Sequence, residues 1–401
     1  MFENLLHQNA SALLSRDVLA GTLPDALLFA GPASSGKLTC ALELSRILSC
    51  AGAEKGRWLC GCDPCRLSKE LISRNMMLLG PRDCLLEIRA AKRAFLEAAY
   101  NNAPFLKATQ YLFIRSVRKL TLRFSPILWE DDDKLPKISP FLQAIDEGID
   151  AMLPEKALPG NDSLSALCDG ITAQCQKLSG SFMYDAVPIG QIRSASGWAR
   201  LTAAGGKKVI ILENVERMNE GARNALLKIL EEPPSGAMFV LTTTRRGAVM
   251  QTMLSRVRTY PFCERGAREQ AEVLSRVFHV DGAGLTVDSH LQSFLPVSRD
   301  EVFSVARAYA EEIRAGGIPS AADVVKSCAG FEPKSLLRLF LLGVQEAFSD
   351  VSCAQCAEFS ARNAAALRDC YSGVAAYNQS AVAAIERLTR DVAANRRACF
   401  G

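Results

Sequence analysis

Asp25-Ala-Leu-Leu-Phe-Ala-Gly-Pro-Ala-Ser-Ser-Gly-Lys37 is the stretch of sequence that decides the fold. Residues 25–32 predict a short buried strand that runs into a Gly/Pro turn, and the apolar spacing of residues 39–50 predicts a helix behind it. The glycines of the turn let backbone N–H groups converge on an anion at the start of that helix, and the lysine adds a point charge. Residues 31–37 therefore indicate a phosphate-binding loop between a strand and a helix.

The loop departs from a complete nucleotide site at the residue after the lysine. A Ser or Thr there would bind Mg²⁺, but the sequence has Leu38, and Thr39 lies about 100° further round the helix. Mg²⁺ coordination is therefore not expected. Two interpretations of the loop stay open: binding of ATP or ADP, and a turn that only keeps the shape of the loop. The candidate nucleotide-binding residues here are Gly31, Ser35, Gly36, Lys37, Leu38 and Thr39.

Further apolar runs extend this unit into a sheet. Residues 76–79, 209–212 and 238–241 predict buried strands. A helix is predicted over residues 222–230, with Asn219 as its cap and two prolines that stop it. Strands that alternate with helices predict an α/β fold with a parallel sheet flanked by helices.

The residues that follow the strand over 209–212 are the second place where the sequence departs from a hydrolysing site. A hydrolysing site needs one carboxylate here for the Mg²⁺ shell and one to orient the attacking water. The sequence offers Glu213 and Asn214, and the amide of Asn214 cannot act as a base. Together with Leu38, this departure argues against ATP hydrolysis.

The rest of the chain is helical in pattern. Residues 80–180 have helical spacing and no pattern that carries chemistry, which indicates a helical insertion. We interpret the basic residues of its segment 113–124 as a solvated helix face rather than a contact with a phosphate backbone. Beyond residue 262 helices follow one another, with a break around Asp350 and a single long helix over residues 364–394. The basic residues of the insertion segment are Arg115, Arg118, Lys119 and Arg123.

Four cysteines lie close together at Cys50-x₉-Cys60-x-Cys62-x₂-Cys65. They supply four thiolates, enough for a closed tetrahedral structural zinc site, and unmetallated core thiols are the alternative. The single residue between the second and third cysteine is Gly61, which would ease a tight turn. A further pair, Cys353 and Cys356, has no partner pair nearby and is expected in the core.

Composition fits a folded protein of more than one domain. A chain of 401 residues is too long for one hydrophobic core. Its 49% hydrophobic and 22% charged residues exclude a disordered or coiled-coil protein, and a net charge of +4 does not by itself indicate nucleic-acid binding. The first residues form no charged leader, and no run of eighteen apolar residues occurs, so we expect a cytoplasmic protein without membrane contact.

Two motifs point to a family. The string Asn224-Ala-Leu-Leu-Lys-Ile-Leu-Glu-Glu-Pro-Pro234 and the segment Leu254-Ser-Arg-Val257, together with the phosphate loop and the cysteine cluster, resemble clamp-loader subunits of bacterial DNA polymerase III. The resemblance covers roughly residues 1–79 and 181–265. It implies an AAA+ P-loop NTPase-like α/β domain that carries a zinc module, followed by a helical lid and an all-α collar. The implied ranges are 1–265 for the AAA+ domain, about 50–65 for the zinc module, about 80–180 for the insertion, 266–318 for the lid and 319–401 for the collar.

Two types of subunit share these motifs. The gamma/tau motor keeps a Lys-Thr pair in the phosphate loop and an Asp-Glu pair after the strand, whereas the delta-prime subunit often has a degraded nucleotide site and acts as a rigid stator. Leu38 and Asn214 place this chain with delta-prime. The resemblance therefore implies a subunit of the polymerase holoenzyme that has no ATPase activity of its own. The implied partners are the gamma/tau and delta subunits, the sliding clamp and primer–template DNA. Two alternatives stay open, an active gamma/tau-type ATPase and a zinc-stabilised DNA-binding repair factor.

The resemblance also assigns roles to individual residues. Ser255-Arg256-Val257 matches the family's Ser-Arg-Cys motif, whose arginine reaches into the ATP site of the neighbouring subunit. A planar, permanently charged guanidinium can stabilise the charge that builds on the γ-phosphate. Thr243 and Thr244 match the sensor position at a strand end, and Arg193 and Arg200 are candidates to face DNA.

Overall fold

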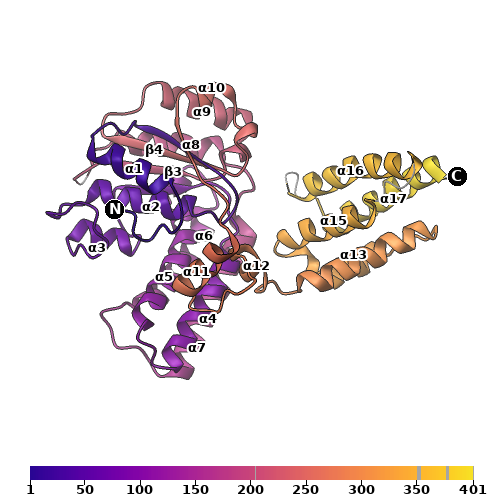
Figure 1. Cartoon of the computed structure of the whole chain (residues 1–401), viewed down its shortest axis with the longest axis horizontal. Coiled ribbons are helices and arrows are strands. Elements are labelled where there is room, and N and C mark those ends of the chain that lie inside the picture. Colours follow the sequence, from indigo (N-terminus) through magenta and orange to yellow (C-terminus); the bar gives the residue numbers. More distant parts are fainter. Residues whose placement is uncertain (204, 350–353, 376–378, 401) are drawn as a thin grey trace. The chain divides into compact units, whose positions relative to one another are not determined.

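The computed structural model describes residues 1–203, 205–349, 354–375 and 379–400. The chain forms two compact units, Met1–His290 and Leu291–Gly401 (Figure 1). The first carries the sheet and the second is helical. Asp350 and Cys353, on which two of the sequence expectations fall, lie outside the described residues. The lid and collar boundaries stay predictions.

A five-stranded sheet organises the first unit. Its order is β2-β3-β4-β1-β5, and every neighbouring pair is parallel. The parallel sheet predicted from the sequence is thus confirmed, and its fifth strand, β5, was not expected. The strands are β1 Ala26–Ala30, β2 Met76–Leu79, β3 Lys208–Leu212, β4 Ala237–Thr243 and β5 Arg258–Pro261.

Helices cover both faces of this sheet. Alternate residues of a strand point to opposite faces, so Leu27 and Phe29 of β1 pack with α2 while Leu28 packs in the core on the other face. Because both faces are covered, strands β1, β2, β3 and β4 are buried along their whole length and mostly apolar, whereas β5 is largely exposed. The helices of this unit are α1 Ala10–Leu19, α2 Lys37–Ser49, α3 Asp63–Lys69, α4 Leu85–Tyr100, α5 Leu106–Thr121, η1 Leu122–Phe124, η2 Pro126–Trp129, α6 Leu135–Asp150, α7 Asn161–Phe182, α8 Ile189–Ala199, η3 Val215–Arg217, α9 Glu220–Glu231, η4 Arg246–Ala248, α10 Gln251–Leu254 and α11 Ala267–Val277. Helix α12, Val287–Gln292, begins in this unit and ends at the first residues of the second.

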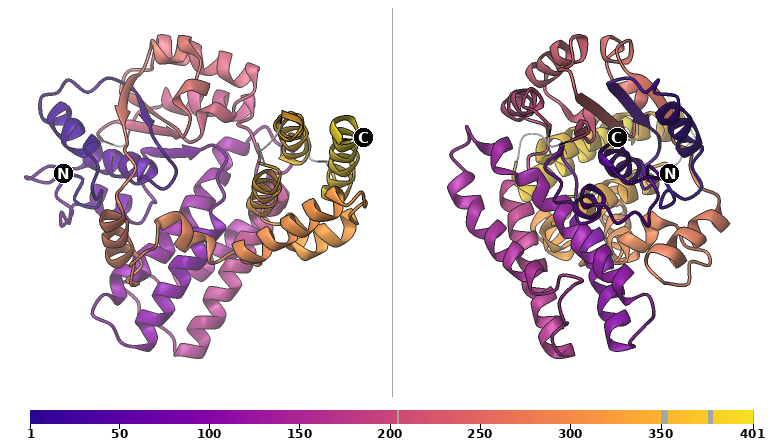
Figure 2. Two further views of the ribbon diagram at one scale, coloured as in Figure 1. Left: turned by 45° about the vertical axis from the view of Figure 1, so that its right-hand side comes forward. Right: turned by 90° about the vertical axis from the view of Figure 1, so that its left-hand side faces the viewer.

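The insertion between β2 and β3 is a group of long helices. Helix α4 packs against α5 and α7, and α6 packs against α7. In both views of Figure 2 these helices extend away from the sheet as one bundle. Their apolar sides continue the core that covers one face of the sheet, so the insertion is built into the first unit rather than loosely attached to it.

The second unit is built of helices packed against one another. Helix α13 packs against α15, and α16 packs against α17. The single helix expected over residues 364–394 is wrong: one helix ends at Ala375 and the next begins at Ala381. Both segments carry helical apolar spacing in the sequence, so the pattern alone did not separate them. The helices of this unit are α13 Arg299–Arg314, α14 Ala321–Ser327, η5 Ala329–Phe331, α15 Ser335–Ala347, α16 Ala354–Ala375 and α17 Ala381–Phe400.

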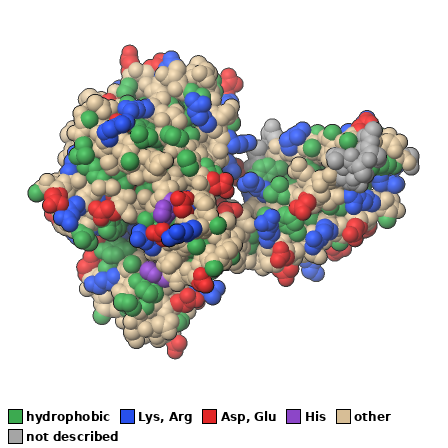
Figure 3. All heavy atoms as spheres, in the orientation of Figure 1, with side chains coloured by type: hydrophobic (Ala, Val, Ile, Leu, Met, Phe, Trp, Pro, Cys, Tyr) green, Lys and Arg blue, Asp and Glu red, His purple; other side chains and the backbone are tan. Residues whose placement is uncertain are grey.

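The surface carries charges of both signs. On the face shown in Figure 3, Lys and Arg side chains are interspersed with Asp and Glu rather than gathered into one basic patch. Among the helices of the described residues, none combines the length and the apolar character needed to cross a bilayer.

Candidate functional site

The parallel sheet brings the predicted nucleotide-site residues to one edge. Strands β1, β3 and β4 end at the same side of the sheet, so Gly31 and Glu213, which follow β1 and β3, and Thr243, the last residue of β4, lie at neighbouring strand ends. A backbone hydrogen bond from Gly31 N to Thr243 O at 3.2 Å ties the phosphate loop to β4. The sequence-predicted loop, acidic and sensor positions therefore meet at one site.

The phosphate loop has the backbone that its sequence predicts. Gly36 has a φ of +91°, and α2 begins at the next residue. A side chain at Gly31 would lie 2.2 Å from the carbonyl oxygen of Phe262, so only glycine fits there. Lys37 folds back into the loop, where its Nζ donates to Gly31 O at 2.7 Å, to Pro32 O, and to Ser35 Oγ at 3.2 Å. Burial lowers the pKa of Lys37 to about 8, although the nearby Glu213 opposes that shift.

Arg265, which the sequence motifs did not indicate, supports the phosphate loop through hydrogen bonds. The Arg265 guanidinium donates to Ser34 O at 3.0 Å and to Ser35 O at 3.1 Å, and also to Leu6 O. Arg265 is far from the loop in the sequence, so no local pattern could indicate this contact. Leu38 is 5% exposed and packs in the apolar core beneath the loop, so it is used for packing and offers no metal ligand.

Glu213 and Asn214, at the end of β3, are both engaged by other residues. Glu213 is 4% exposed and lies between the guanidinium groups of Arg82 and Arg123. Asn214 has a left-handed backbone, with φ 54°, and its Nδ2 donates to Pro81 O at 2.6 Å. The amide that stands at the base position is therefore committed to a structural hydrogen bond.

The interpretation of the basic insertion residues as a solvated helix face is wrong. Arg115 donates to Lys69 O at 2.5 Å and Arg118 to Glu70 O at 2.7 Å, at the carboxyl end of α3. Helix α5 packs inside the first unit, so its long cations satisfy the carbonyls that a helix end leaves unpaired. Lys119 pairs with the carboxylate of Glu87, and Arg123 pairs with the buried carboxylate of Glu213.

The two threonines at the end of β4 have different roles. Thr243 is buried, and its Oγ1 accepts a hydrogen bond from Arg245 N at 3.0 Å. Thr244 donates from Oγ1 to Glu216 Oε1 at 2.9 Å, and its backbone N–H donates to the same oxygen. Both hydroxyls thus stabilise the turn that follows the strand, and their sensor role stays a prediction.

Arg256 lies just after the short helix α10. Its Nη1 donates to Thr252 O at 2.6 Å and its Nη2 donates to Glu231 Oε1 at 2.6 Å. The side chain is 32% exposed, so the guanidinium is held in place and accessible from outside at the same time. Arg193 and Arg200 are likewise exposed, on α8 and at its end.

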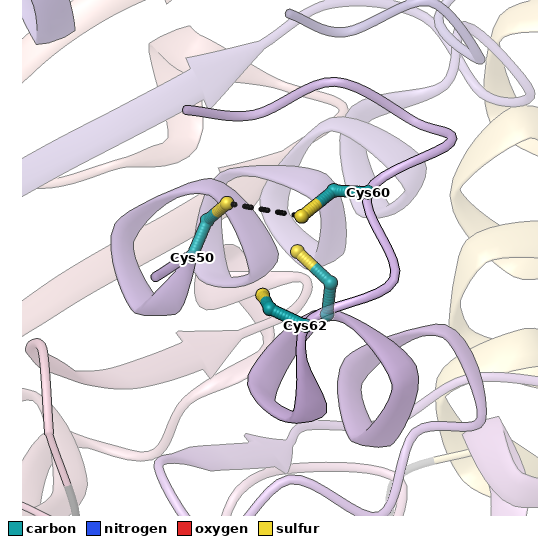
Figure 4. A group of neighbouring side chains, drawn as sticks. Cys50, Cys60 and Cys62 are labelled. Atoms are coloured by element: carbon teal, nitrogen blue, oxygen red, sulfur yellow. Dashed lines mark hydrogen bonds between the residues drawn. The ribbon is translucent and has the colours of Figure 1, made fainter. Parts of the chain in front are cut away.

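The four clustered cysteines converge between α2 and α3 (Figure 4). Their Sγ atoms lie within 4.8 Å of one another, and those of Cys50 and Cys60 are 3.8 Å apart. A tetrahedron with Zn–S bonds of about 2.3 Å has edges of about 3.8 Å, so this donor set fits a zinc ion. Burial alone would raise the pKa of Cys62, but backbone hydrogen bonds from Cys65 and Ala51 lower it to about 6. The thiolate form that binds metal is therefore favoured at this residue.

One buried arginine organises the chain around the cluster. All five N–H donors of Arg46 have acceptors, and the side chain is 1% exposed. Two go to Glu43, one to Gly56 O at 2.8 Å, one to Arg57 O at 2.9 Å and one to Cys65 Sγ at 3.1 Å. Arg46 belongs to α2, so the metal loop is tied directly to the helix that starts at the phosphate loop.

The glycine that the cluster needs is not the one expected. Gly61 has no positive φ, and a side chain there would meet nothing within 4 Å. A Cβ at Gly52, by contrast, would lie 2.6 Å from Cys60 Sγ. Close approach of the sulfur, rather than a tight turn, is what requires glycine in this module.

Comparison with known proteins gives relatives of one kind. A DNA polymerase III subunit delta' of Pseudomonas aeruginosa is 30% identical over 129 residues, which cover 32% of this chain and 38% of that protein. A DNA polymerase III subunit tau of Bacillus subtilis is 44% identical over 55 residues, 14% of this chain and 10% of that protein. The matched parts thus span well under half the length of these relatives. A solved gamma subunit-related protein of Thermotoga maritima has 17% identity and a TM-score of 0.29, over 53% of this chain and 80% of that one.

The family comparison covers more of the sequence. The model of the family described as "DNA polymerase III, delta subunit" matches residues 6–124 and 171–265, together more than half of the chain. The matched ranges hold the phosphate loop, the cysteine cluster, Glu213 and Arg256, and they leave out α6. The resemblance inferred from the sequence motifs is confirmed: this chain belongs to the DNA polymerase III delta subunit family.

Proposed function

We propose that this chain is a non-hydrolysing, delta-prime-like subunit of a DNA polymerase III clamp loader, and that Arg256 acts in trans at the ATP site of a neighbouring subunit. The observation that carries the proposal is the engagement of Asn214. A base is needed at this position to orient water, and here an amide donates to Pro81 O at 2.6 Å instead. Leu38, buried where a metal-binding hydroxyl would stand, supports the same conclusion.

Arg256 suits a role in a neighbour's site. An arginine supplied from another subunit acts only when the complex has assembled, which couples hydrolysis to assembly. The guanidinium is partly exposed, and its orientation is fixed by Glu231 and Thr252. Gamma/tau and delta subunits are the proposed partners, and the sliding clamp and primed DNA are the proposed targets of the whole complex.

Zinc, in this proposal, has a structural role. Cys50, Cys60, Cys62 and Cys65 would hold it, and closed coordination by four thiolates leaves no position for a reacting water. The ion would supply a cross-link between the end of α2 and the start of α3.

The test is reconstitution with the gamma/tau and delta subunits of the same organism. With Arg256→Ala we expect DNA-stimulated ATP turnover at the neighbouring site to fall by roughly a hundredfold or more, since arginine fingers contribute at least that much. Arg246→Ala, an exposed arginine on nearby η4, is the matched control and should leave turnover unchanged. Equal turnover with Arg256→Ala and with wild type would reject the role in trans.

The rival function is an active gamma/tau-type ATPase. The complete Gly31–Lys37 loop and the matching tau relative favour it. ATP turnover by the isolated chain, abolished by Lys37→Ala, would decide for the rival.

A further inference from the structure

The carboxylate at the end of β3 is saturated by cations from the chain itself. Arg82 Nη1 donates to Glu213 Oε1 at 3.0 Å, and Arg123 Nη2 donates to Glu213 Oε2. Each oxygen of the buried carboxylate therefore faces its own guanidinium group. In an ATPase of this fold class, a carboxylate at this strand end would instead contribute to the shell of Mg²⁺.

The two arginines come from the beginning and the middle of the segment between β2 and β3. Arg82 follows β2 closely, and Arg123 lies in η1, directly after α5 of the helical insertion. Arg123 is 2% exposed, and its Nη1 also donates to Gly80 O at 2.6 Å. The indole N–H of Trp129 donates to Arg123 O at 2.9 Å, which fixes the backbone that carries the guanidinium.

A second carboxylate extends the network. Arg82 Nη2 donates to Glu87 Oε2 at 3.0 Å, and Lys119 Nζ pairs with the other oxygen of Glu87. Two carboxylates are thus surrounded by three cations, and Lys37 of the phosphate loop lies within electrostatic range of Glu213 and Arg82.

Mg²⁺ does not fit this arrangement. It requires oxygen ligands in near-ideal octahedral geometry and keeps several waters. Both oxygens of Glu213 are already used, Asn214 is turned to Pro81 O, and Leu38 offers no hydroxyl. A divalent cation placed at Glu213 would also meet the positive charge of the two arginines at close range, where repulsion inside a protein is strong.

We infer that Arg82 and Arg123 replace the divalent cation at Glu213, so that the nucleotide site of this chain is closed to metal by its own insertion. The inference rests on the proposed function in one respect only, that the chain does not hydrolyse ATP. It adds a physical cause that neither the phosphate loop nor Asn214 supplies. It also gives the helical insertion a role, which is to hold a guanidinium group at the strand end.

Binding of Mn²⁺ to the full-length, zinc-loaded chain tests the inference. Free Mn²⁺ is followed by electron paramagnetic resonance in the presence of ADP, for wild type and Glu213→Gln. We expect the two proteins to leave the same free Mn²⁺ signal. Sequestration of Mn²⁺ by wild type that Glu213→Gln abolishes would overturn the inference, and it would leave the proposed role of Arg256 untouched.

A second set of variants gives a test in which the inference predicts a change rather than an unchanged signal. In Arg82→Gln/Arg123→Gln the carboxylate of Glu213 is left buried without a counter-ion, which is costly, so we expect a lower melting temperature that Mn²⁺ partly restores. Adding Glu213→Gln should abolish the Mn²⁺ effect. Arg93→Gln, an exposed arginine of α4, is the control and should behave like wild type. A double variant as stable as wild type, or one that gains no Glu213-dependent response to Mn²⁺, would contradict the inference. If the double variant does not fold, Arg82→Gln alone is used. It frees only Glu213 Oε1, so we expect a smaller loss of stability and a smaller Glu213-dependent response to Mn²⁺, and the absence of both would contradict the inference.

Discussion

Arg256 donates a hydrogen bond from Nη2 to Glu231 Oε1 at 2.6 Å, which joins the arginine of the Ser-Arg-Val segment to the carboxyl end of α9. Glu231 belongs to the Leu-Glu-Glu-Pro-Pro string on which the resemblance to clamp-loader subunits rests. Two motifs that are separate in the sequence therefore form one unit in space. Glu231 fixes the direction of the guanidinium, and the backbone oxygen of Thr252 holds it from the other side.

This relationship predicts a positioning role for Glu231. In the reconstituted complex, Glu231→Gln should lower ATP turnover by up to about fivefold, because an exposed ion pair stabilises one orientation by at most about 1 kcal/mol. Arg256→Lys should have turnover as low as that of Arg256→Ala, because lysine lacks the planar fork of the guanidinium. Glu232→Gln, at the adjacent exposed carboxylate, is the matched control. Equal turnover for Glu231→Gln and Glu232→Gln would remove the positioning role.

Zinc affinity should depend on Arg46. Arg46→Lys keeps the charge but loses the fork that reaches Gly56 O, Arg57 O and Cys65 Sγ together. We expect zinc binding to weaken by about tenfold or more, the usual effect of removing a residue that orients metal ligands. Competition with a chromogenic chelator measures the change.

The control for this experiment is Arg57→Lys. Arg57 pairs with Glu54 at the surface, so its substitution should leave zinc binding unchanged. The wild-type chain should carry about one zinc ion, held by four thiolates. A chain with no bound zinc, or an Arg46→Lys variant that binds it as tightly as wild type, would contradict the assignment.

Stability at low pH should depend on Glu87. Burial alone would raise the pKa of this carboxyl, but Lys119 and Arg82 lower it from 4.5 to about 2. A carboxyl with a lower pKa in the folded state contributes stability that is fully present above its unfolded pKa and is lost as the pH falls through its folded pKa. The contribution should therefore fade between about pH 4.5 and about pH 2.

Glu87→Gln should accordingly lower the free energy of unfolding by roughly 3 kcal/mol at neutral pH, and by progressively less as the pH falls. Urea unfolding at several pH values measures the difference from wild type. Glu97→Gln, at an exposed residue of the same helix, should have little effect at any pH. A difference for Glu87→Gln that does not depend on pH would show that Lys119 and Arg82 do not act on its ionisation.

Restoring the missing hydroxyl should not restore catalysis. Leu38→Thr places a hydroxyl directly after Lys37, but Asn214 and the pairing of Glu213 remain. We expect no ATP turnover by the isolated variant, and a loss of about 1–3 kcal/mol in the free energy of unfolding because a polar group enters an apolar core. Urea unfolding and a phosphate-release assay measure the two effects. ATP turnover by Leu38→Thr alone would mean that a single residue had disabled the site.

The sheet could be predicted from the sequence because its strands are buried on both faces. Strands β1, β3 and β4 are continuous apolar runs, and each is followed by a polar or glycine signal at the same edge. Strand β5 was missed because Arg258-Thr-Tyr-Pro261 is a polar edge strand with a proline at its end. Its place in the sheet comes from pairing with β1, which no local pattern encodes.

The candidate site was predictable where its residues are neighbours in the chain. The phosphate loop and the four cysteines lie within short segments, and each forms the cluster that its spacing indicates. The pairing of Arg123 with Glu213 joins residues 90 positions apart, and a basic residue on an amphipathic helix has the same local pattern whether it faces water or a buried carboxylate. Only the packing of α5 inside the first unit distinguishes the two.

The measurement that tests the central claim most directly is ATP turnover by the purified full-length chain alone, compared with the same chain added to its gamma/tau and delta partners. We predict no turnover by the isolated chain above that of Lys37→Ala, and a DNA-stimulated rate in the assembled complex that depends on Arg256. Turnover by the isolated chain that Lys37→Ala removes would contradict the account.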